Sequence, residues 1–257
     1  MNKILLGTIA PIALAIAFSG AAYADGIGDV SATVSGSYGG TTSAGTAKIY
    51  GANGTINIPF DVSVADVTGV EGDIDLHSVD YSGDVFNAGG ALYVGGASGR
   101  LAAGYWYHQS KEVGNKILNQ VGGGGQWFVS PDVDLAVNVG GILSHNNGGG
   151  YVGGQLKWYV VPDVSVSASL GYVSYSRDVT TAKIEAEWLI SESVPVAVYG
   201  GYQNINNIKG VKTGKDNVLY VGLRLYVNGG SAETLVDRQR TGSLGFVTQS
   251  PIAYDQY

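Results

Sequence analysis

Two polar residues two positions apart, His108 and Ser110, are of the types that nucleophilic catalysis needs. An imidazole beside a hydroxyl can take its proton, and an amide such as that of Asn115 or Asn119 can orient the imidazole. Residues two apart on an extended chain share one face, so the spacing suits a base and a nucleophile on one strand. The alternative is a polar strand end that runs into a loop. Deciding between them requires the fold of the surrounding chain.

A second stretch, residues 69–84 (GVEGDIDLHSVDYSGD), is rich in carboxylates: Glu71, Asp73, Asp75, Asp80 and Asp84. Oxygen-rich loops bind Ca²⁺ or share the divalent ions that bridge lipopolysaccharide, but EF-hand spacing is absent and a solvated acidic loop is the simpler interpretation. The Gly-rich run at 119–127 (NQVGGGGQW) lacks the lysine and the helix of a phosphate-binding loop. We therefore expect no metal and no cofactor.

The composition narrows the class of protein. The 257 residues include 41 Gly, 17 Tyr, no Cys and one Met, and 14% are charged, against about 25% in a soluble domain. Without cysteine there is no disulfide framework. The net charge is −7, and nucleic-acid binding needs a basic surface instead. We expect no nucleic-acid partner.

Residues 1–24 have the pattern of a secretory signal peptide. A single charge at Lys3 precedes an apolar stretch and a small-residue close at Ala22-Tyr23-Ala24. The apolar run is too short for a membrane-spanning helix. We expect export and cleavage after Ala24, which takes the net charge from −7 to −8.

A tryptophan followed by a turn recurs along the chain. WFVSPDVDLAVNVGG, WYVVPDVSVSASLGY and WLISESVPVAVYGGY begin at Trp127, Trp158 and Trp188, at intervals of 31 and 30 residues. The residues after each turn alternate apolar and polar with period two, and so do those before it. Period two is the signature of a β-strand, so each interval predicts a β-hairpin.

Counting hairpins predicts the fold. Turn signals stand at Asp61, Ser98-Gly99, Pro131-Asp132, Pro162-Asp163 and Glu192-Ser193. Six units of two strands fit, which predicts an all-β, closed antiparallel barrel of about 12 strands over residues 25–227. An Asn53-Gly54 type I′ turn would change the count, so 10 to 14 strands stay open.

The Trp residues indicate which face of the strands lies outside. Trp127, Trp158 and Trp188 share the apolar face and stand at strand ends. In a soluble sandwich large aromatics belong in the core, whereas a Trp at an apolar strand end suits a membrane interface. The opposite face is rich in Ser, Gly, Asn and Tyr, as a wet lumen would be. We expect a transmembrane barrel with these three Trp at the interface and the short turns in the periplasm.

With the signal peptide, the hairpin period and Gly/Tyr-rich strands, residues 25–227 resemble the porin-like outer-membrane β-barrel proteins of Gram-negative bacteria. The strand YVGLRLYV resembles their assembly signal, with Gly222, Leu225 and Val227 at matching positions. The resemblance implies location in the outer membrane, contact with its lipid and lipopolysaccharide, and the barrel-assembly machinery as a partner. Residues 228–257 depart from the pattern: either this tail lies in the periplasm or Tyr257 closes a further strand.

The pair His108 and Ser110 can now be weighed. It resembles the His-x-Ser of outer-membrane phospholipases, but Lys111-Glu112 stands where those lipases have Asn-Gly. Tyr107 belongs to the face predicted to contact lipid. Because side chains alternate, His108 and Ser110 point into the lumen, which a lipid acyl chain does not enter. We expect no enzyme, with a lipase as a remote alternative.

The inward charges are the more informative site. Five are candidates to line a pore: Lys157, Lys183, Glu185, Glu187 and Arg224. They either set the ion selectivity of a narrow passive channel or form a ladder that fills and stabilises a structural barrel. A surface protein whose loops mediate adhesion is the other alternative. The solute and the oligomeric state stay open.

Overall fold

The computed structural model describes most of the chain between Val30 and Leu244, and the predicted signal peptide lies outside the described residues. The described ranges are 30–41, 48–64, 67–79, 83–110, 116–144, 148–175, 178–190, 195–209, 215–228, 234–242 and 244.

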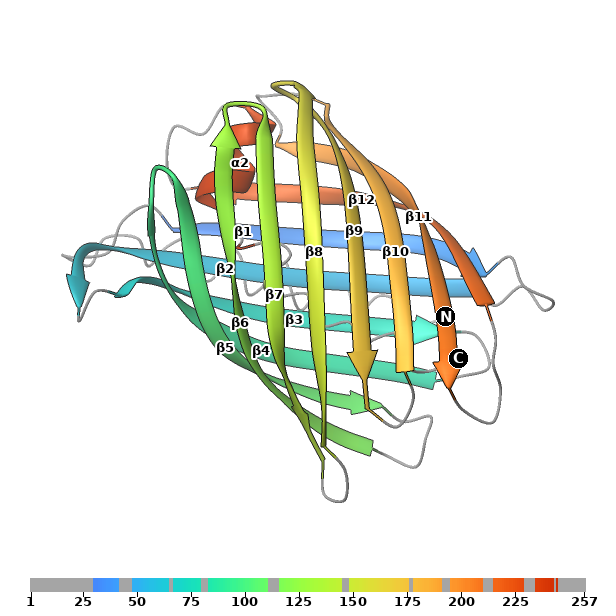
Figure 1. Ribbon diagram of the computed structural model, residues 1–257. Coiled ribbons are helices and arrows are strands. Elements are labelled where there is room, and N and C mark those ends of the chain that lie inside the picture. The colour runs from blue at the N-terminus through green and yellow to red at the C-terminus, as the bar shows by residue number, and fades with distance from the viewer. Residues whose placement is uncertain are drawn as a thin grey trace.

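Twelve antiparallel strands form one closed barrel, as predicted (Figure 1). They are β1 (Ser31–Thr41), β2 (Lys48–Val64), β3 (Val67–Val79), β4 (Gly83–Gly96), β5 (Gly99–Ser110), β6 (Lys116–Ser130), β7 (Val133–Leu143), β8 (Gly148–Val161), β9 (Val164–Ser174), β10 (Asp178–Leu189), β11 (Val196–Lys209) and β12 (Lys215–Asn228). Each strand pairs with its neighbours in sequence, and β1 also pairs with β12 from Ser31↔Asn228 to Thr41↔Val218. Because the sheet closes on itself, it has no free edge.

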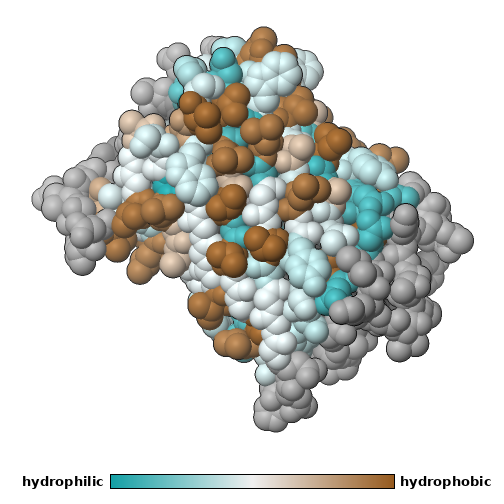
Figure 2. Space-filling view, in the orientation of Figure 1, coloured by the Kyte–Doolittle hydropathy of each residue, from teal (hydrophilic) through white to brown (hydrophobic). Residues whose placement is uncertain are grey.

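The alternation of each strand sets the two surfaces of the barrel. On β7, Asp134, Ala136 and Asn138 are buried inside, whereas Leu135 and Val137 are exposed on the outside. Figure 2 shows apolar side chains over the outer surface of the strands that face the viewer. An apolar exterior around a polar interior is the arrangement of a membrane barrel, which confirms the predicted facing of these strands.

The early turns differ from the sequence prediction. Asp61 lies within the bounds of β2, which runs on to Val64, so the first turn comes later than predicted. The Asn53-Gly54 hairpin does not form either, because Gly54 pairs with Val34 on one side and Ile74 on the other. β2 pairs without interruption with β1 and β3 on both sides of Asn53 and Gly54, from Ile49 to Asn57, so no turn forms there.

One short helix, α2 (Leu235–Thr241), follows β12. The Thr234 hydroxyl accepts a hydrogen bond from the Asp237 amide and the Asp237 carboxylate accepts from the Thr234 amide, which is a capping box. In the described part of the chain, no helix is long and apolar enough to cross a membrane.

We call residues 234–242 and 244 the C-terminal segment. It does not hang away from the barrel: α2 lies beside the short turns (Figure 1), where the Val236 amide donates to the Pro162 carbonyl at 3.3 Å. Its side chains contact lumenal residues of several strands. The predicted strand closed by Tyr257 lies outside the described residues, and the periplasmic side assigned to the tail stays a prediction.

Candidate functional site

Four of the five predicted pore-lining residues form one charged group on the lumenal face of β10 and β12. Lys183 Nζ lies 2.8 Å from Glu185 Oε2, and Arg224 lies 3.8 Å from Glu185 Oε1 and also bonds Glu187. Tyr220 donates a 2.7 Å hydrogen bond to Glu185. We call these four charged residues the ion-pair group. The carboxylates are thus compensated, and the excess of acid that β10 alone suggests is removed by Arg224.

A glycine on β11 lets this group form across a strand. Gly201 pairs with Glu185 on one side and Tyr220 on the other. A Cβ at position 201 would lie only 2.4 Å from the Tyr220 hydroxyl. Since no side chain stands there, the phenol can cross β11 to reach Glu185.

The fifth candidate, Lys157 on β8, is held by the C-terminal segment. Its Nζ donates a 2.7 Å hydrogen bond to Gln239 Oε1, and the Tyr159 hydroxyl shares its one hydrogen between that oxygen at 3.1 Å and Asp134 Oδ2 at 3.0 Å. On the other side of the amide, Gln239 Nε2 donates to Glu187 at 3.0 Å and to the Tyr226 hydroxyl at 3.1 Å. One glutamine therefore connects Lys157 to the ion-pair group.

Arginines fix the segment on the other strands. Arg240 Nη2 lies 2.6 Å from Asp134 Oδ1 and also donates to the Ser130 carbonyl at 2.7 Å. The Gly242 carbonyl accepts from Asn57 at 2.7 Å and from Arg100 at 2.8 Å. These contacts join β2, β5, β6 and β7 to the segment.

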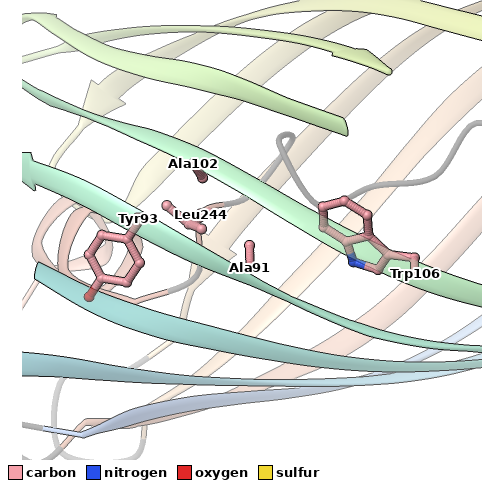
Figure 3. Close-up of a cluster of buried hydrophobic side chains, with 5 residues drawn as sticks. All are labelled: Ala91, Tyr93, Ala102, Trp106 and Leu244. Carbon is pink, nitrogen blue, oxygen red and sulfur yellow. The ribbon is translucent and has the colours of Figure 1, made fainter. Parts of the chain in front are cut away.

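The last described residue lies deep in the lumen. The Leu244 amide donates a 2.5 Å hydrogen bond to Glu71 of β3, and its side chain packs with Ala91, Tyr93, Ala102 and Trp106 (Figure 3). At the start of the helix, Leu235 packs with Leu189, Ala197 and Tyr226. The segment is therefore anchored by an apolar residue at each end.

The four charged side chains of the ion-pair group differ in their exposure to solvent. The side chains of Lys183, Glu185 and Arg224 are 18, 13 and 17% exposed, whereas that of Glu187, beside the C-terminal segment, is 3% exposed. Water therefore reaches a small part of the Lys183, Glu185 and Arg224 side chains and is largely excluded from Glu187 next to the segment.

The opposite wall carries a chain of hydrogen bonds that includes both described histidines. His77 Nε2 lies 2.8 Å from Asp75 Oδ2, and Asn87 Nδ2 donates to that same oxygen at 3.1 Å. His108 Nδ1 lies 2.7 Å from Asn87 Oδ1, and Nε2 lies 3.2 Å from Gln120 Oε1. Both ring nitrogens of His108 therefore meet amide oxygens.

The residues considered for catalysis are not assembled together. Asn119 lies on the outer face, where its side-chain oxygen accepts a hydrogen bond from Tyr105 at 2.5 Å, so it does not orient His108. The side chain of Ser110 and all of Asn115 and His145 lie outside the described residues.

The acidic stretch is a strand and not a loop where the structure describes it. Glu71, Asp73 and Asp75 lie on β3, and Asp73 accepts from Thr55 at 2.9 Å and from Trp106 at 3.4 Å. Asp80 and the side chain of Asp84 lie outside the described residues. No group of three or more potential metal ligands occurs in the described part of the chain.

The predicted interface aromatics lie on the outer surface. Trp127, Trp158 and Trp188 are 41, 53 and 54% exposed and stand near the short turns. Toward the other strand ends the outer face carries a second aromatic set that sequence reasoning missed, with Tyr105 and Tyr202 nearer the middle of their strands: Tyr38, Tyr50, Phe86, Tyr105, Tyr107, Tyr172 and Tyr202. Two of its pairs contact each other, Tyr38 with Tyr50 and Phe86 with Tyr107. Aromatic girdles at both edges of an apolar band are typical of membrane barrels.

Sequence reasoning also missed the residues that hold the C-terminal segment, notably Asn57, Arg100, Asp134, Gln239 and Arg240. A local signal for the helix was present: Thr234 and Asp237 have capping-box spacing, and Gly242 follows the last turn. No local signal shows where that helix packs.

Comparison with known proteins supports the architecture. No protein-family model and no curated protein matches the chain. Among solved structures, NanC porin is similar with a TM-score of 0.58 and 9% identity over 76% of this chain and 98% of that one. KdgM porin is similar with a TM-score of 0.53 and 9% identity over 75% and 98%. A KdgM porin in complex with disordered oligogalacturonate has a TM-score of 0.51 and 10% identity over 74% and 98%. The chain thus has the fold of the porin-like outer-membrane β-barrels.

Proposed function

We propose that this protein is an outer-membrane β-barrel that acts as a narrow passive diffusion channel, closed at its turn end by its own C-terminal segment. The observation that carries the proposal is the partial exposure of three charged lumenal side chains. Those of Lys183, Glu185 and Arg224 are 13–18% exposed, and charged side chains that reach water line the aqueous paths of channels. Beside the segment, by contrast, Tyr159, Asp134 and Glu187 are almost completely buried.

The similar structures support the same class of function. NanC and KdgM are described as porins, and one KdgM structure holds disordered oligogalacturonate. At identities near 10% this likeness concerns the fold. The same fold and the two aromatic sets support an outer-membrane location.

A purely structural barrel is the second candidate. It is favoured by the density of pairing inside: the ion-pair group, the Gln239 contacts and the Asp134–Arg240 pair would together hold the lumen shut. In that case the segment is a permanent filling and no state of the protein conducts.

Recordings in planar bilayers separate the two candidates. The chain ending at Asn228 lacks every described residue of the C-terminal segment, and we expect it to give discrete single-channel currents. We expect the full chain to be closed for most of the recording. A truncated chain that is folded by heat-modifiable gel migration, yet passes no current, would contradict the channel and leave the structural barrel.

A further inference from the structure

The turn end of the lumen has the properties of a site that recognises a peptide. The strands β1–β12 complete the barrel without the C-terminal segment, since each is paired on both sides between Ser31 and Asn228. The segment adds no strand to the sheet. Its relation to the barrel is therefore that of a ligand to a finished site.

The barrel binds the side chain of Gln239 through contacts that require an amide. The side-chain oxygen of Gln239 accepts from Lys157 and lies 3.1 Å from the Tyr159 hydroxyl, and its nitrogen donates to Glu187 and Tyr226. Only a side-chain amide offers an acceptor and a two-hydrogen donor on one planar group. A glutamate at this position would have two acceptor oxygens, one of them facing the Glu187 carboxylate.

The backbone of the segment and its charged residue Arg240 also have partners on the barrel. The Gly242 carbonyl meets two donors, Asn57 and Arg100, and the Leu244 amide meets the carboxylate of Glu71. Arg240 meets Asp134 and lies over the Phe128 and Tyr159 rings, with centroid distances of 4.9 and 5.6 Å. Hydrogen bonds of this kind, with charged partners and little water, are the stronger ones in proteins.

The overall charge favours a cationic occupant. Among the lumenal side chains that the structure describes, six are carboxylates and four are basic, which leaves a net charge of −2: Glu71, Asp73, Asp75, Asp134, Glu185 and Glu187 against Arg100, Lys157, Lys183 and Arg224. The segment contributes Arg238 and Arg240 against Asp237. A peptide with this excess of arginine partly compensates the wall.

From these contacts we propose that the turn end of the lumen is a peptide-binding site. Its ligand is a short helical peptide with apolar ends, a central glutamine and a following arginine, supplied here by Leu235, Gln239, Arg240 and Leu244. The same peptide binds when it is supplied as a separate molecule. The proposal extends the closure described under the proposed function, but it concerns binding and does not require that the barrel conducts.

The test uses the barrel that ends at Asn228, in detergent or in vesicles, and a synthetic peptide of residues 234–244 with a fluorophore at its N-terminus and an amide at its C-terminus, so that its net charge is +1. We expect saturable binding by anisotropy. A peptide with Gln239→Glu should bind at least tenfold more weakly, and a scrambled peptide should not bind. Equal binding of the native and scrambled peptides would overturn the proposal, because only non-specific charge attraction would then remain.

A double-mutant cycle locates the site. The barrel variant Asp134→Asn should weaken binding of the native peptide by tenfold or more, yet leave binding of an Arg240→Ala peptide nearly unchanged. Additive losses would place Arg240 away from Asp134 and contradict the proposed site. Because anisotropy reports binding alone, a barrel that binds but never conducts would contradict the channel and not this inference.

A second design serves if the truncated barrel does not fold. A protease recognition sequence inserted within residues 229–233 of the full chain allows the barrel to fold before the segment is cut. After cleavage, excess labelled peptide should replace the native segment at a measurable rate. Failure to exchange, together with immediate loss of the cut segment into solution, would overturn the proposal.

Discussion

The Glu187 carboxylate of β10 accepts a 3.0 Å hydrogen bond from the side-chain amide of Gln239, 52 residues further along the chain. Glu187 also accepts from Arg224 and from Tyr226. A residue assigned to the pore wall from its sequence position is thus saturated by the segment that fills the lumen. Its role in this state is to hold the closure, while Lys183 and Glu185 stay in contact with water.

The barrel should fold without its tail. Truncation after Asn228 removes no strand and leaves the β1–β12 pairing complete. We expect the truncated chain to keep heat-modifiable migration on gels, with a lower melting temperature because the contacts of Gln239, Arg240 and Leu244 are lost. Loss of heat-modifiability would show that the segment is needed for folding.

The Asp134–Arg240 pair should control how firmly the segment is held. Asp134→Asn removes a charged partner, and hydrogen bonds of that kind contribute about 1.5–3 kcal/mol. Since 1.4 kcal/mol is a factor of ten, trypsin should cleave after Arg238 or Arg240 about ten times faster or more, as read by mass spectrometry of the product. Asp132→Asn, at an exposed turn position two residues away, is the control and should not change the rate. Equal rates in both variants would mean that the pair does not hold the segment.

The facing of the strands can be tested with two aspartates. Trp158→Asp puts a carboxylate on the outer face near the interface, where even Arg or Lys costs only about 0–1 kcal/mol and Asp costs less; its main effect is therefore loss of the indole that anchors the strand end. Ser169→Asp points into the lumen, with Lys183 as its register partner on β10. We expect poor assembly of the first variant and near-normal assembly of the second, measured as the heat-modifiable fraction. Equal damage would contradict the assigned facing.

Selectivity should respond in opposite directions to two neutralisations in the truncated barrel. The described lumenal charges sum to −2, so the open barrel should prefer cations. Lys183→Gln should strengthen this preference and Glu185→Gln should weaken it, because the two side chains are 2.8 Å apart on the same wall. Reversal potentials in a KCl gradient measure both. Shifts of the same sign would mean that these residues do not line the conducting path.

The strands were predictable because their signal is local. The alternation around Val133 to Val139 fixes both the strand and its outer face, and the Trp before each turn marks the strand end. The first turn was misplaced at Asp61 because β2 continues past a register irregularity between Pro59 and Val64 to the pair Val64↔Val67.

The closure of the lumen was not predictable from local patterns. Asn57 and Gly242 are 185 residues apart, and Glu71 and Leu244 are 173 apart. Such contacts depend on the closed shape of the barrel, which brings every strand around the segment. The sequence therefore indicated inward charges on β10 and β12, but it gave no sign that Gln239 lies among them.

The most direct test of closure by the C-terminal segment is to link that segment to β1 by a disulfide. Native cysteines are absent, so Ser31→Cys with Thr241→Cys introduces a single possible disulfide, at a site where Ser31 Oγ lies 3.5 Å from the Thr241 carbonyl oxygen. A disulfide needs Cα atoms about 4.4–6.8 Å apart, and mass spectrometry verifies that it forms. In planar bilayers the account predicts a closed barrel while the bond is oxidised and channel openings after reduction. An oxidised, fully bridged barrel that conducts as well as the reduced one would contradict it.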